Sequence, residues 1–232
     1  MGLTKRIVPV NARRALAKQL DRLPEGPLRD NFANLVTLNG LCMVAAGASM
    51  GGKKGAIISA LGELHDDVDG DTARHLNTVD RRGAFIDAGA DKAKVAIEMA
   101  RLFASTANLS DGERPVRRLA LGLIATKHLV NSALNVSATA RGLNAETSRA
   151  GKINMWVDGT AMAAFRLSDA IKDPQASQAF AAIGYAATAV GVPIGVHTAA
   201  GYIRETIIHP QPLEQSEPTL IALESTAEQS GL

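Results

Sequence analysis

The stretch DDVDGDTARHLNTVDRRGAFIDAGAD, residues 66 to 91, decides how the rest of the chain is interpreted. Four of its aspartates, Asp66, Asp69, Asp87 and Asp91, are separated by three, eighteen and four positions. Residues three or four apart on a helix share one face. We therefore expect the first two carboxylates to project together from one helix and the last two from the next. If these helices pack side by side, all four carboxylates converge.

Four converging carboxylates repel one another, and a divalent cation bound between them removes the repulsion. Carboxylate oxygens are hard ligands that suit Mg²⁺ or Mn²⁺. Such an ion can bridge a pyrophosphate and stabilise charge during phosphoryl transfer. The spacing therefore predicts a metal site formed by Asp66, Asp69, Asp87 and Asp91.

Two other interpretations of these acidic residues must be weighed. An isolated D-x-x-D pair on a helix usually belongs to a solvated face. A calcium-binding loop is the other interpretation. It fails because, with Gly70 at the sixth loop position, His65 is first and Leu76 is twelfth, where acidic ligands are required. The longer pattern is more specific than either alternative, and we favour it.

The whole stretch resembles the signature of CDP-alcohol phosphotransferases, which is D-x-x-D-G-x-x-A-R, eight residues, then G-x-x-x-D-x-x-x-D. Every defining position is filled, and Lys92 fits the D-x-x-x-D-K ending common in that family. The resemblance implies that a hydroxyl attacks a CDP-linked lipid or alcohol and that CMP leaves.

The resemblance also assigns residue roles. It implies that Asp66, Asp69 and Asp87 hold the divalent cations on the pyrophosphate, and that Asp91 is the general base for the acceptor hydroxyl. The residues that would line the CMP pocket are Gly70, Ala73, Arg74 and Gly83. The glycines among them lack side chains and would let the nucleotide approach the backbone closely.

The composition bounds the class of protein. The chain has 232 residues and a net charge of +2, so we expect no nucleic-acid partner. Its single cysteine, Cys42, excludes a disulfide framework within the chain. With 21% charged residues and a mean hydropathy of +0.03, composition favours a soluble helical protein. The resemblance instead implies an all-α membrane bundle of six transmembrane helices, and we favour that architecture.

Three segments are expected. Residues 1–30 carry seven basic and three acidic residues and a weak leucine stripe, which predicts an amphipathic helix on an anionic membrane surface or an ordinary solvated helix. Residues 31–205 form the transmembrane domain. Residues 206–232 form a Pro-, Glu- and Ser-rich tail that we expect to be disordered.

Hydropathy and turn signals place the helices at about residues 32–51, 55–74, 83–106, 116–138, 152–171 and 178–203. The first opens with Asn34 and Thr37, an N-x-x-T similar to the start of the family's first helix, and both side chains could face the nucleotide. The third carries Lys94, Glu98 and Arg101, charges that the signature does not explain and that are expensive inside a membrane.

The acceptor alcohol is suggested by basic residues near the expected cytoplasmic end, namely Lys127, Arg141, Arg149 and Lys152. A phosphorylated acceptor such as glycerol 3-phosphate needs such a cluster, although an ordinary positive-inside loop is the alternative. We favour a phosphatidylglycerophosphate-synthase-like reaction between CDP-diacylglycerol and glycerol 3-phosphate. Phosphatidylinositol-phosphate synthesis is the near alternative, and a non-catalytic helical binding protein is the alternative from a different class.

The distribution of basic residues predicts orientation. Fourteen lysines and arginines lie in the segments on the side of the aspartates and six in the opposite loops. The excess predicts a multi-pass protein of the inner membrane with both termini and the site facing the cytoplasm. Family members often form dimers, so we expect membrane-lipid contacts and a homodimer.

Overall fold

The computed structural model describes residues 19–22, 24–78, 81–141 and 149–208, and within these ranges it contains helices and turns but no strand. A short helix α2 (Pro27–Asp30) precedes the long helices α3 (Phe32–Met50), α4 (Gly52–Leu76), α5 (Arg81–Ser105), α6 (Glu113–Ala140), α7 (Arg149–Ala170) and α8 (Pro174–Ile203). A 3-10 turn, Thr106–Asn108, follows α5, and a π-helical turn, Arg204–Ile208, follows α8. The expected all-α class is confirmed.

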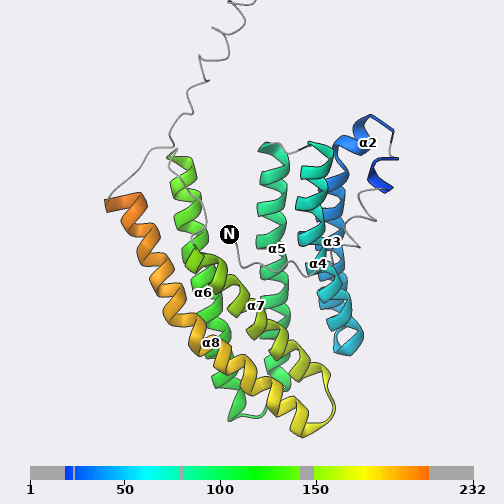
Figure 1. The fold of residues 1–232 in the computed structure, drawn as a ribbon. Coiled ribbons are helices and arrows are strands. Elements are labelled where there is room, and N and C mark those ends of the chain that lie inside the picture. The colour runs from blue at the N-terminus through cyan, green and yellow to red at the C-terminus, as the bar shows by residue number, and fades with distance from the viewer. Residues whose placement is uncertain (1–18, 23, 79–80, 142–148, 209–232) are drawn as a thin grey trace, which may run out of the picture.

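The long helices begin and end within a few residues of the positions expected from the sequence. They run alternately up and down, so the junction of α4 and α5 lies at the upper end of the molecule in Figure 1. Most of the amphipathic segment predicted at residues 1–30 and of the tail predicted at 206–232 lies outside the described residues, and both remain predictions.

Two turns fix the course of α4. Gly51 and Gly52 connect it to α3 with φ angles of +64° and +57°, which side-chain-bearing residues rarely adopt. At its other end Asn77 takes the left-handed conformation, which asparagine tolerates, and ends the helix. The amide of Thr78 then donates to the carbonyl of Ala73 over 3.0 Å. The chain thereby reverses between Asp69 and Asp87.

Helices α3 and α4 are brought together by glycines. A Cβ placed on Gly62 would lie 2.6 Å from the carbonyl oxygen of Gly40, and one placed on Gly40 would lie 2.8 Å from the carbonyl oxygen of Gly62. Real Cβ atoms essentially never approach backbone that closely, so only glycine fits at this contact. Small residues of this kind let helix backbones pack directly against each other. The contact holds Thr37 of α3 next to α4.

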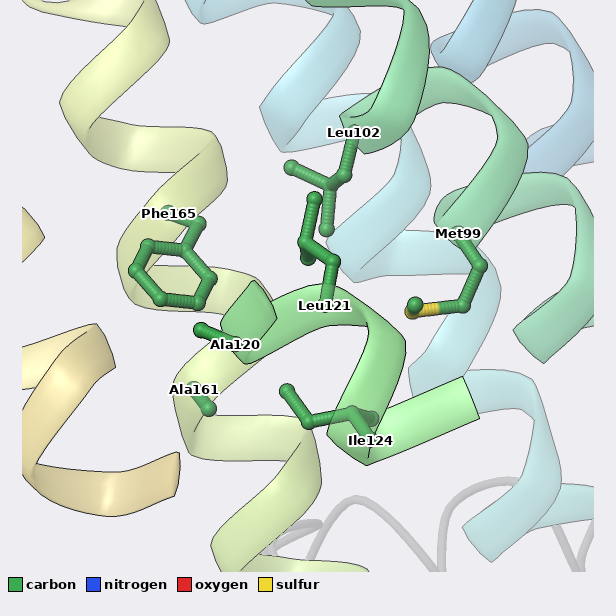
Figure 2. Packing of buried hydrophobic residues seen from close by; sticks show 7 residues of the cluster. All are labelled: Met99, Leu102, Ala120, Leu121, Ile124, Ala161 and Phe165. Atoms are coloured by element: carbon green, nitrogen blue, oxygen red, sulfur yellow. The ribbon is translucent and has the colours of Figure 1, made fainter. Parts of the chain in front are cut away.

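The apolar core lies in the other half of the molecule, where α5, α6 and α7 meet. Figure 2 shows Phe165 and Ala161 of α7 packed against Leu121 and Ile124 of α6, with Leu102 of α5 beside them. Tyr185 of α8 meets the Phe165 ring edge-on at a centroid distance of 5.1 Å. This core anchors α8 and leaves the α4–α5 end for the polar residues.

The distribution of polarity is the reverse of that in a water-soluble bundle. Lys94, Arg117 and Asp158 are buried, with at most 1% of their surface exposed. Large apolar side chains instead cover the outside of the same helices, and Leu119 and Leu129 of α6 are 65% and 72% exposed. An outer surface of this composition suits a hydrocarbon environment better than water.

By length and composition, α3 and α8 are apolar enough to cross a membrane. Among the described helices, α4 to α7 do not meet that criterion. The six transmembrane helices expected from the resemblance therefore remain a prediction.

Candidate active site

A pocket of about 190 Å³ opens where α2, α3, α4 and α5 meet. Its lining residues are Asp30, Ala33, Asn34, Thr37, Asp69, Gly70, Ala73, Arg74, Thr78, Gly83 and Asp87. The reversal of the chain at Asn77 creates it, because the last turns of α4 and the first turns of α5 supply opposite walls.

Most of the residues expected from the sequence lie around this pocket. The lining includes all six positions expected to contact the CDP moiety and, among the predicted metal ligands, Asp69 and Asp87. Asp91 lies one turn beyond Asp87 on α5 and is not part of the lining. Asp66 lies on α4, but its side chain is outside the described residues.

The carboxylate of Asp69 is held in one orientation. Only 2% of this residue is exposed. The hydroxyl of Thr37 donates to Oδ2 over 2.5 Å, and the backbone amide of Gly70 donates to Oδ1 over 2.6 Å. Because Thr37 is itself buried on α3, the hydrogen bond couples the two helices. Thr37 thus contacts a carboxylate at the pocket wall, a partner that the sequence did not identify.

A positive charge faces the same pocket. Both terminal nitrogens of Arg74 lie 3.3 Å from the point where a Cβ on Gly70 would be. A side chain at residue 70 would therefore crowd the guanidinium. Guanidinium groups bind phosphate oxygens through two parallel hydrogen bonds. The pocket therefore contains carboxylate oxygens that can bind a cation and a guanidinium group that can bind an anion.

Sequence reasoning missed three lining residues, the apolar Ala33 and the polar Asp30 and Thr78. Asp30 ends the short helix α2, in a segment that the sequence assigned to the membrane surface. Thr78 lies in the eight-residue spacer whose composition the signature leaves open. Its hydroxyl oxygen is buried without a hydrogen-bond partner among the described residues, so a polar atom of a ligand would satisfy it.

The residues present are of the right type for a divalent cation. Asp69 and Asp87 contribute carboxylate oxygens to one pocket, which are the ligands that Mg²⁺ and Mn²⁺ prefer. Among the side chains that the structure describes, no cluster of three potential ligands is close enough to hold an ion. Asp66, a third expected ligand, is not among those side chains.

The basic residues expected at the acceptor site fall into two groups. Arg141, Arg149 and Lys152 are exposed near the junction of α6 and α7. Only 9% of the Lys127 side chain is exposed, and its ammonium group forms an ion pair with Asp158 of α7 at 2.6 Å. None of the four lines the pocket described above.

One of the comparisons with known proteins identifies a family. A family model described as CDP-alcohol phosphatidyltransferase matches residues 30–194, which include α3 to α7 and the whole pocket. No curated protein and no solved structure gives a significant match. The matched region covers well over half of the chain, so the chain belongs to the CDP-alcohol phosphatidyltransferase family and is a transferase that moves a substituted phosphate group from a CDP-alcohol to an acceptor alcohol.

Proposed function

We propose that the protein transfers a phosphatidyl group from CDP-diacylglycerol to glycerol 3-phosphate, giving phosphatidylglycerophosphate and CMP. The observation that carries this proposal is that Arg74, Asp69, Asp87 and the glycines at 70 and 83 line the same pocket. A cation-binding and a phosphate-binding group facing each other suit a diphosphate.

The cation proposed for this site is Mg²⁺ or Mn²⁺, in keeping with a family that generally depends on divalent metals. Asp66, Asp69, Asp87 and Asp91 are the residues that would hold it. When bound, the ion would neutralise charge on the diphosphate during transfer. The short contacts from Thr37 and Gly70 would keep Asp69 oriented before the ion arrives.

Asp91 is proposed as the general base. Its carboxylate accepts the proton of the acceptor hydroxyl as that oxygen forms a bond to the phosphorus of the phosphatidyl group. The bond between this phosphorus and the oxygen that bridges to CMP breaks, and CMP leaves with the electron pair. Arg74 would hold the departing phosphate by charge-assisted hydrogen bonds. The support for this role is that Asp91 lies on α5 one turn past Asp87, which lines the pocket.

The acceptor phosphate is proposed to bind the exposed cluster of Arg141, Arg149 and Lys152. Lys127 could join them only if its ion pair with Asp158 opens. A phosphorylated inositol is the second candidate acceptor, since it presents the same phosphate chemistry to these residues.

We propose that the bundle crosses the inner membrane six times, as a homodimer, with the pocket facing the cytoplasm. The support is the inverted polarity, with buried charges in α4 to α7 and large exposed apolar side chains outside. The non-catalytic alternative, a peripheral helical binding protein, predicts release by high salt or carbonate. We expect the protein to stay in membranes through both washes and to require detergent, as followed by blotting the fractions.

The enzymatic test is CMP release from CDP-diacylglycerol by purified protein with a panel of alcohols, including glycerol 3-phosphate and inositol 1-phosphate. We expect glycerol 3-phosphate to give the highest kcat/KM. Asp91→Asn should lower kcat by about a hundredfold or more, because it removes the proton acceptor. Asp111→Asn is the matched control, since the Asp111 carboxylate is almost fully exposed at the opposite end. Unchanged turnover in Asp91→Asn would refute the assigned base.

Thr37→Val tests the support of Asp69. The substitution keeps the shape of the side chain but removes the hydroxyl that donates to Oδ2. We expect the apparent affinity for Mn²⁺, measured by isothermal titration, to fall by about tenfold to a hundredfold. Thr37→Ser should retain most of the affinity. Thr188→Val is the control, because Thr188 is equally buried but its hydroxyl donates only to Gly184 within its own helix.

A further inference from the structure

Lys94 is a buried cation that the family signature does not explain. Only 1% of this residue is exposed, which places its ammonium inside the bundle. It lies on α5 three residues after Asp91, and Asp87 precedes Asp91 by four. Residues at spacings of four and three occupy one face of a helix. The face of α5 that carries the proposed base therefore continues directly into Lys94.

From Asp91 onward the charges along this face alternate in sign. The ammonium of Lys94 is 3.9 Å from a carboxylate oxygen of Asp91. One turn further, Glu98 forms an ion pair with Arg166 of α7. Arg166 also donates to the carbonyl of Gly47 on α3 over 2.6 Å. The lower part of the face is thus fixed to two other helices, which restricts movement of α5 around Lys94.

A buried ammonium is stable only beside an anion. Here an anion is the carboxylate of Asp91, whose side chain is 31% exposed while that of Lys94 is 2% exposed. The carboxylate is therefore near a buried cation while part of its side chain stays accessible. Because attraction between charges in a poorly solvated interior is strong, the ammonium limits the orientations open to the carboxylate.

We propose that Lys94 is a positioning residue for Asp91: it holds the carboxylate on the face of α5 that continues from the pocket, in the orientation needed to accept the acceptor's proton. This inference rests on the proposed function, because it assigns Lys94 a role through the base named there. It also gives a reason why α5 carries a buried lysine, although few other charged residues are buried among the described residues of this helix.

The test is a double-mutant cycle of Lys94→Met and Asp91→Asn in the full-length protein, with kcat and KM for CDP-diacylglycerol measured separately. In the wild-type background Lys94→Met should lower kcat by about tenfold to a hundredfold, the cost of a misplaced reacting group. The KM should change by less than about twofold, since binding of the nucleotide is unaffected. In the Asp91→Asn background Lys94→Met should leave kcat unchanged. Lys94→Arg in the otherwise wild-type protein should retain most of the wild-type kcat.

Arg117→Met is the control for loss of a buried cation. Arg117 is as buried as Lys94 and forms an ion pair with Asp169 at 3.4 Å, at the end of the molecule opposite the pocket. We expect Arg117→Met to lower Tm while kcat per folded molecule stays near the wild-type value. The proposal is overturned if Lys94→Met lowers Tm but leaves kcat per folded molecule near the wild-type value, as expected for Arg117→Met. It is also overturned if Lys94→Met lowers kcat equally with and without Asp91.

Failure of the proposed function can be distinguished from failure of this inference. If the wild-type protein releases no CMP from any CDP-alcohol, the proposed function fails. The wild type, Lys94→Met, Asp91→Asn and the double variant are then compared by thermal unfolding in detergent. A coupling between Asp91 and Lys94 in Tm supports the positioning contact, and strictly additive changes in Tm overturn it.

Discussion

Asp69→Asn is expected to lower kcat for CMP release by about a hundredfold to a thousandfold. The substitution preserves the size of the side chain but removes the negative charge of the most buried carboxylate in the pocket. An amide is a poor ligand for a hard divalent cation, so charge on the diphosphate would lose its compensation. The measurement is kcat per folded molecule across a range of Mg²⁺ concentrations.

The fold should survive this change, because the amide oxygen can still accept one of the two hydrogen bonds that Thr37 and Gly70 donate to Asp69. We expect far-UV circular dichroism to be unchanged and Tm to shift by only a few degrees. Asp111→Asn again controls for the chemical substitution at an exposed site. A kcat for Asp69→Asn within about threefold of the wild-type value would contradict the assignment of this pocket as the transferase site.

Asp158→Leu is expected to give the largest loss of stability, about 3 to 5 kcal/mol. Asp158 is fully buried, and it accepts hydrogen bonds from Lys127 at 2.6 Å and from the amide of Asn154 at 3.1 Å. Leucine would leave the ammonium of Lys127 buried without this carboxylate. Glycine at residue 191 makes room for the pair, since a Cβ there would lie 2.9 Å from both charged atoms.

The companion variant, Lys127→Met combined with Asp158→Leu, separates loss of the pair from loss of one partner. Replacing both charges with apolar groups of similar size is often neutral, so much of the stability should return. Reversible unfolding in detergent micelles measures both variants, with Lys127→Met alone as the third corner of the cycle. If Asp158→Leu unfolds within about 1 kcal/mol of the wild type, the ion pair is not a structural contact.

The helices and most of the pocket could be predicted because their signals are local. Asp66 and Asp69, or Asp87 and Asp91, are neighbours on a helix by spacing alone, and glycines and Asn77 mark where α4 begins and ends. The partners of the buried charges could not be predicted in the same way. Lys127 and Asp158 are 31 positions apart, and the packing of α6 and α7 against α8, not any local pattern, brings them together.

Composition alone also pointed away from a membrane for a physical reason. Mean hydropathy averages every side chain regardless of the direction in which it faces. In this bundle Lys94 and Arg117 face inward while Leu119 and Leu129 face outward, and the average does not register this difference. Asp30 and Thr78 were missed because the segment or spacer that contains each carries no motif, and only the fold brings them to the pocket.

The ion pair between Glu98 and Arg166 has a consequence for the order of biosynthesis. Its two residues are 68 positions apart, so the ribosome completes α5 well before it makes the guanidinium that neutralises Glu98. In the six-helix membrane bundle that we propose, a lone carboxylate is costly in the hydrocarbon interior, which disfavours early release of α5 into lipid. We therefore expect the insertion machinery to retain α5 until α7 has been translated, so that the two helices enter the bilayer together.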